Sequence, residues 1–142
     1  MHSLRHRRLA LLFPLLTSLT IWSVARAQEE VPTRDHIPDR YKWNLQAIYP
    51  DLVQWEADFT RAQEMVEKLA KRKDAGFSSA SDLRDTLILR DDARWVVDKL
   101  VVYSSQHSDQ DTRDTAALGL KNRAETLSVK YAEAKAWIEP SI

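Results

Sequence analysis

The chain has 142 residues, with 21 basic and 21 acidic side chains, four histidines and no cysteine. This length predicts one domain at most. The lack of cysteine excludes both a disulfide framework and a thiol nucleophile, so stability must come from packing.

The first 27 residues have the pattern of a secretory signal peptide. The basic segment MHSLRHRR precedes a 16-residue apolar run, LALLFPLLTSLTIWSV, and small residues at Ala25 and Ala27 suit a signal peptidase, so we expect cleavage after Ala27. A membrane anchor is the alternative, but the run contains Pro14 and is shorter than the roughly 20 residues of a spanning helix. We therefore expect an exported protein, periplasmic or secreted, with no stable membrane insertion after cleavage.

Residues 28–49 follow as a lead-in whose opening, QEEVPTRDHIP, is polar and holds two prolines, which predicts an extended segment. The leader holds four arginines and no acid, so residues 28–142 carry 17 basic and 21 acidic side chains, a net charge of −4. A mildly acidic protein is a poor partner for nucleic acid or for an anionic membrane surface. We therefore expect neither as a partner.

Three segments with helical periodicity come next, at about residues 50–73, 81–106 and 115–138. In the first and third, apolar residues recur at alternating steps of three and four, the spacing of one helix face. Pro50 or Asp51 is expected to start the first helix, and Ser79 or Ser81 to cap the second. The expected buried stripes are Leu52, Trp55, Phe59, Ala62, Val66 and Leu69, then Leu83, Leu87, Val97, Leu100 and Val101, then Leu120, Ala124, Leu127, Tyr131, Ala134 and Ile138.

Within the second segment, WVVDKLVVY at residues 95–103 is apolar on nearly every side. Its β-branched residues would also suit a strand. No turn signal separates it from the helical pattern before it, so a helix is favoured. Such a helix needs cover on several faces, and the third segment, together with a further part of the protein, is a candidate to provide it. Residues 50–142 are thus expected to form an all-α domain, an antiparallel bundle of three long helices joined by loops of about six to ten residues, incomplete at its C-terminus.

No catalytic constellation is visible in the sequence. After cleavage only His36 and His107 are left, which excludes a paired-histidine metal motif, and both are expected to be solvated or capping. The segment SDQDTRD at residues 108–114 is acidic, as a calcium-binding loop would be. An EF-hand loop that starts at Asp109 would need an oxygen ligand at its fifth position, Gly at its sixth and Glu at its twelfth. This chain has Arg113, Asp114 and Leu120 at those positions, so the match fails. We expect an inter-helix loop whose aspartate caps the next helix.

Other chemical signals are equally weak. Gly76 and Gly119 stand alone, so no phosphate-binding loop is present. Asp91 and Asp92 are adjacent and should point apart on a helix, and the basic run at residues 71–73 suits a helix C-terminus. The sequence therefore assigns no catalytic, cofactor-binding or metal-ligating residue.

Three segments resemble, in order, the N-terminal region of oligoendopeptidase F proteins. The first segment comprises IP at residues 37–38, YKWNL at 41–45, IYP at 48–50 and WEAD at 55–58. The second segment comprises VYSS at 102–105 and SDQDT at 108–112. The third segment is WIEP at 137–140. These matches cover about residues 37–142. The expected signal peptide differs from the usual pattern of this family, because many of its members look cytosolic.

The resemblance implies a zinc metalloendopeptidase, related to thimet oligopeptidase, that hydrolyses short peptides. The Zn²⁺ ligands it implies, an HExxH motif and a later glutamate, belong to a catalytic domain absent from this sequence. The chain would then be the N-terminal helical portion, inactive alone and binding no cofactor itself, with the missing catalytic domain as its partner. Trp43, Leu45, Ile48 and Tyr49 are expected to anchor the lead-in on the bundle or on a neighbouring domain.

A different class of function is the alternative. Three capped and patterned helices are also what a complete small secreted protein-binding module would need. A degenerate gene product without function is a third possibility.

Overall fold

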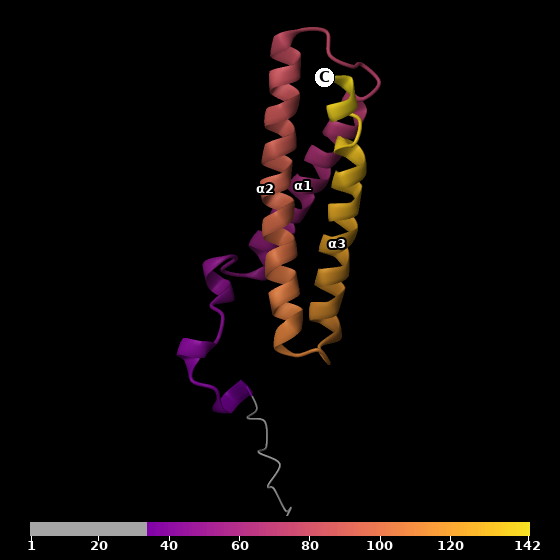
Figure 1. Cartoon of the computed structure of the whole chain (residues 1–142). Helices are drawn as coiled ribbons and strands as arrows, with labels where there is room; N and C mark the ends of the chain where they lie inside the picture. The colour runs from indigo at the N-terminus through magenta and orange to yellow at the C-terminus, as the bar shows by residue number, and fades with distance from the viewer. Residues whose placement is uncertain (1–33) are drawn as a thin grey trace, which may run out of the picture. The chain divides into compact units, whose positions relative to one another are not determined.

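The structure, a computed structural model, describes residues 34–142, and three long α-helices dominate this part of the chain. They are α1 (Leu52–Arg72), α2 (Ala80–Gln110) and α3 (Thr115–Lys135). Each helix packs against the other two, with α1 crossing obliquely behind α2 and α3 (Figure 1). Residues 34–142 contain no strand. The expected all-α bundle is confirmed, whereas the expected signal peptide and its cleavage point lie outside the described residues.

Each long helix begins at a side-chain cap. The carboxylate of Asp51 accepts a hydrogen bond from the backbone N–H of Gln54 at 2.9 Å. The hydroxyl of Ser79 accepts one from the N–H of Asp82 at 3.1 Å, and Asp114 accepts two at the start of α3. These caps satisfy backbone donors that the helix itself leaves unpaired. The predicted caps are confirmed, with Ser79 rather than Ser81 serving α2.

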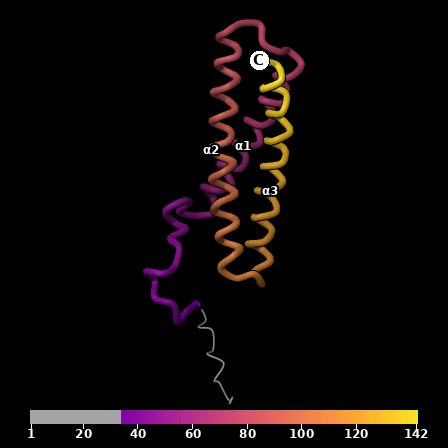
Figure 2. Tube along the Cα trace, in the orientation of Figure 1, coloured from indigo at the N-terminus to yellow at the C-terminus, as the bar shows by residue number. Residues whose placement is uncertain are grey.

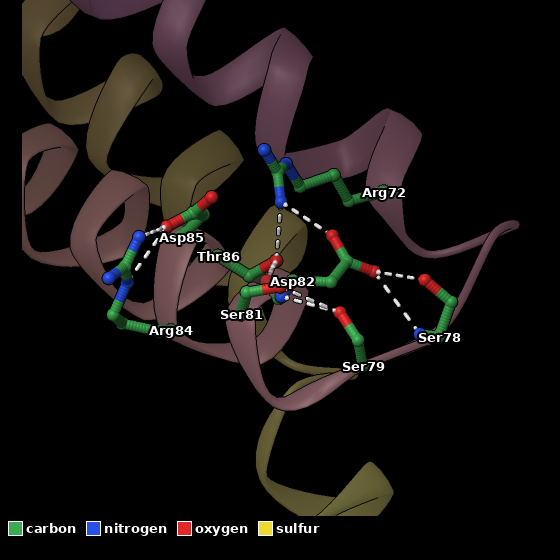
Figure 3. A network of polar contacts seen from close by, with 8 residues as sticks. All are labelled: Arg72, Ser78, Ser79, Ser81, Asp82, Arg84, Asp85 and Thr86. Carbon is green, nitrogen blue, oxygen red and sulfur yellow. Dashed lines mark hydrogen bonds and ion pairs between the residues drawn. The ribbon is translucent and has the colours of Figure 1, made fainter.

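A polar network fixes the turn between α1 and α2 (Figure 3). The guanidinium of Arg72 donates to Thr86 Oγ1 at 2.7 Å and to Asp82 at 3.2 Å, and the other carboxylate oxygen of Asp82 accepts from the backbone of Ser78. Gly76 ends the turn at φ 62°, a left-handed conformation that glycine adopts without strain. One arginine thus ties the last turn of α1 to the first turns of α2.

The core lies where the inner stripes of the three helices meet. Trp55, Leu69, Leu100 and Leu127 are almost completely buried, and each such side chain contributes about 2–3 kcal/mol to stability. The buried residues of the core cluster are Tyr49, Trp55, Phe59, Ala62, Val66, Leu69, Ala93, Val96, Val97, Leu100, Tyr103, Ala124, Leu127, Tyr131, Ala134 and Ile138. The predicted stripes are confirmed on α1 from Trp55 onward and on most of α3. On α2 only Val97 and Leu100 of the predicted stripe are buried, because Leu83, Leu87 and Val101, like Leu120 on α3, are half-buried.

An arginine closes the α1–α3 side of the bundle. Arg123 donates two hydrogen bonds to the carboxylate of Glu56, at 2.6 and 2.7 Å, and its guanidinium lies over the rings of Trp55 and Phe59. This pairing lowers the pKa of Glu56, chiefly through the hydrogen bond from Arg123. The planar guanidinium therefore both pairs with a charge and covers the two aromatic rings.

Two details of the expected helices are wrong. Leu52, predicted to be buried, is exposed at the first residue of α1. Residues 108–110, expected in the inter-helix loop, form the last turn of α2, and only residues 111–114 connect it to α3. Ser104 and Ser108 extend the buried face of α2, and the Ser104 hydroxyl donates to the carbonyl of Leu100 at 2.8 Å.

The lead-in from residue 34 onward contains three short 3-10 helices, Arg34–His36, Asp39–Tyr41 and Leu45–Ala47, before it reaches α1 (Figure 2). At the other end, a last short 3-10 helix, Glu139–Ser141, lies beside the α1–α2 connection (Figure 1). Phe77 of that connection stacks on Trp137 with 5.1 Å between ring centroids. Within residues 34–142 no helix has the length and apolar character needed to cross a membrane.

The core assignment predicts a contrast between two leucines. Leu100→Ala should lower the free energy of unfolding by about 2–5 kcal/mol, because it leaves a cavity at a fully buried position. Leu118→Ala, at an exposed position on α3, should change it by less than about 0.5 kcal/mol. Urea unfolding of both variants measures the contrast. Similar losses for the two would contradict this description of the core.

Candidate interaction surface

The histidines and acidic residues singled out in the sequence do not form one site. His36 is exposed in the first 3-10 helix, whereas His107 is half-buried in α2, with its ring 5.7 Å from the ring of Tyr103. In the described part of the chain, no three histidine, cysteine, aspartate or glutamate side chains gather closely enough to hold a metal ion. Asp91 pairs with Arg90 at 2.8 Å on the solvated side of α2.

The acidic segment at residues 108–114 has structural partners instead. Asp111 accepts hydrogen bonds from the guanidinium and the backbone N–H of Arg113, which lower its pKa to about 2. Asp109 lies 3.9 Å from Lys121, and Asp114 caps α3. The predicted capping aspartate is confirmed, and these carboxylates are held by helix ends and cations of the bundle itself.

Tyr49 anchors the lead-in to both α1 and α2. Its side chain is 2% exposed, and its hydroxyl donates to Asp58 on α1 at 2.9 Å. From α2, Lys99 Nζ lies 3.9 Å from the centre of the Tyr49 ring, and Tyr103 packs edge-on at 5.3 Å. Burial, followed by the hydrogen bond to Asp58, raises the pKa of Tyr49. Leu45 and Ile48 pack partly buried against the same core, so the predicted anchoring is confirmed for these three residues.

Trp43 differs from these anchors, because 58% of it is exposed. Docking on the bundle is therefore the wrong expectation for this residue. Trp43 and the exposed Tyr41 instead border a shallow cleft of about 200 Å³, whose opposite side is formed by Gln106, Asp109 and Gln110 at the end of α2.

The outward side of α2 carries exposed apolar side chains as well. Ile88, Trp95 and Val102 are exposed and recur every seven residues, which places them on one helix face. Trp95 is 72% exposed. Helical geometry puts Gln106 and Asp109 further along the same face, where they line the cleft bordered by the lead-in.

We call this surface the aromatic face; it consists of Ile88, Trp95, Val102, Tyr41 and Trp43. Its exposed side chains are aromatic and aliphatic, a composition that suits recognition. Tryptophan and tyrosine are the side chains that most often dominate the affinity of protein interfaces. The apolar run at residues 95–103 does not by itself predict this face; the seven-residue spacing of Ile88, Trp95 and Val102 is the sequence signal that corresponds to it.

The Tyr49 contact predicts a dependence of stability on high pH. A raised pKa means that the folded state favours the neutral phenol, so its contribution is fully present below pH 10 and is lost as the pH rises through the folded-state pKa. Tyr49→Phe should cost about 1–2 kcal/mol at pH 7 through the lost hydrogen bond. It should also make the alkaline loss of stability shallower than in the wild type. Urea unfolding from pH 7 to 11 measures both effects, and identical alkaline slopes would contradict the role of this phenol.

Comparison with known proteins gives no match to a family model and none to a solved structure. Curated proteins do match. "Oligopeptidase PepF" of Bacillus subtilis (strain 168) is 29% identical over 113 residues, which are 80% of this chain and 17% of that protein. "Oligoendopeptidase F, plasmid" of Lactococcus lactis subsp. cremoris is 34% identical over 109 residues, 75% of this chain and 18% of that protein.

A further relative, "Oligoendopeptidase F, chromosomal" of the same Lactococcus subspecies, is 30% identical over 112 residues, 78% of this chain and 18% of that protein. The chain thus spans less than a fifth of the length of these relatives. These similarities agree with the resemblance that the three sequence segments carry. The chain is therefore related to the oligoendopeptidase F family, over a partial region of those proteins.

Proposed function

We propose that this chain is the N-terminal helical portion of an exported, oligoendopeptidase F-like zinc metalloendopeptidase that hydrolyses short peptides. The observation that carries the proposal is the 29–34% identity to proteins named for oligopeptidase or oligoendopeptidase activity, over less than a fifth of their length. The ordered motifs at residues 37–58, 102–112 and 137–140 support the N-terminal placement.

The described residues do not fit a zinc site. Zinc in such enzymes needs three protein ligands that converge on one ion, and no such group exists within residues 34–142. We therefore place the zinc and its ligands in the part of the protein outside the match, together with the chemistry that the metal supplies. The bundle's role is that of a helical wall that narrows access to the peptide-binding cleft.

Export rests on the sequence alone. The basic start, the apolar run and the small residues at Ala25 and Ala27 support a cleaved leader. Sequencing the amino terminus of the native protein tests this directly, and the expected first residue is Gln28. A native protein that still begins at Met1 would contradict cleavage.

A self-contained secreted binding module is the competing function. The exposed aromatic face supports it as well, because a binding module also needs an exposed recognition surface. The two functions differ in enzymatic activity, which one experiment measures.

Antibodies raised against residues 34–142 should precipitate, from the exported fraction of the source cells, material that hydrolyses short peptides. A zinc chelator should abolish this hydrolysis, because the proposed mechanism depends on a bound metal. The recombinant chain, residues 28–142, serves as the matched control and should show no turnover with or without added zinc.

Two outcomes count against the proposal. Precipitated material without peptidase activity would favour the binding module. Chelator-sensitive hydrolysis by the recombinant chain itself would overturn the assignment of the zinc site to another part of the protein.

A further inference from the structure

We propose that the aromatic face of α2 and the lead-in is the surface on which the remainder of an oligoendopeptidase F-like polypeptide docks. This inference rests on the proposed function and deepens it, because it names the partner and the residues of contact. Trp95 is 72% exposed on α2 and is not part of the core cluster. An apolar face of this kind in a folded protein marks an interaction site.

The shape of the face suits a macromolecule rather than a small ligand. Ile88 and Asp109 are separated by about 30 Å along α2, at about 1.5 Å per residue. The cleft at one end, beneath Tyr41 and Trp43, measures only about 200 Å³. A long, shallow and largely convex surface is typical of protein–protein contacts, whereas small molecules bind in deeper concave sites.

The charges around the Ile88–Trp95–Val102 stripe indicate what a partner must supply. Asp91 and Asp98 have arginine partners on their own helix, and Arg84 and Lys99 lie on the same side of α2, so the border of the stripe carries both signs. Asp92 has no ion-pair partner within residues 34–142. The face therefore fits a partner segment that brings apolar side chains together with a lysine or arginine for Asp92.

The comparisons favour a partner within the same polypeptide. The named relatives carry more than four-fifths of their length outside the match. A match that covers three quarters or more of this chain necessarily includes the centre of α2. The relatives thus have a counterpart of this helix and a large remainder that can cover it.

The test compares thiol labelling in two proteins. This chain has no cysteine, so Trp95→Cys gives a single reactive thiol, and Val129→Cys gives a matched control on the exposed side of α3. The same two changes are made at the aligned positions of the whole Bacillus oligopeptidase. The rate of reaction of each cysteine with a maleimide reagent is then followed by mass spectrometry of its peptide.

In this chain both cysteines should react at similar, fast rates. In the whole relative, the cysteine aligned with Trp95 should react about tenfold or more slowly than the one aligned with Val129, because reaction there requires local opening of a contact. Protection at the Trp95 position no greater than at the Val129 position would overturn the proposal.

A second copy as occupant gives a different result. In that case labelling of Trp95→Cys in this chain itself would slow as protein concentration rises, which would also overturn the proposal. Because the labelling is measured in the relative and in the chain, its outcome is independent of the chelator-sensitive hydrolysis that tests the proposed function. The failure of the docking proposal and the failure of the proposed function are therefore distinguishable.

Discussion

α2 carries apolar side chains around more of its circumference than two neighbouring helices can cover, and the rest of the structure follows from this constraint. Its inner side packs Val97 and Leu100 against α1 and α3 and forms the core. Its outer side leaves Trp95 in solvent. The helices α1 and α3 each bury one apolar stripe against α2 and against each other. Because α2 has more apolar surface than α1 and α3 cover, it contributes both to the core and to the exposed aromatic face.

Much of the fold was predictable because it depends on local rules. Stripes at three- and four-residue steps gave the helices and most of the core, and aspartate and serine caps gave their beginnings. Periodicity does not indicate where neighbouring helices end, which is why Leu52 was wrongly placed in the core. The sequence does not predict the extra turn of α2 because Ser108 is polar, although its small side chain packs in the interior.

The interaction surface was less predictable, because exposure depends on how the three helices are arranged. Tyr49 and Trp43 belong to the same aromatic motif, yet Tyr49 is buried and Trp43 is exposed. Tyr49 lies where Asp58 and Lys99 meet, so its hydroxyl and its ring both find partners. No such partners surround Trp43, which lies with Tyr41 beside the end of α2. The packing of α2 against α1 and α3, rather than the motif, decides which aromatic residues are available to a partner.

The nucleotide sequence that follows the codon of Ile142, read in all three forward frames, tests the central claim most directly. If this chain is one portion of an oligoendopeptidase F-like enzyme, that sequence encodes a further polypeptide with an HExxH motif, in frame or after a frameshift. A stop codon with no such coding sequence behind it would contradict the claim. The helical bundle would then stand as a binding module whose aromatic face serves another protein.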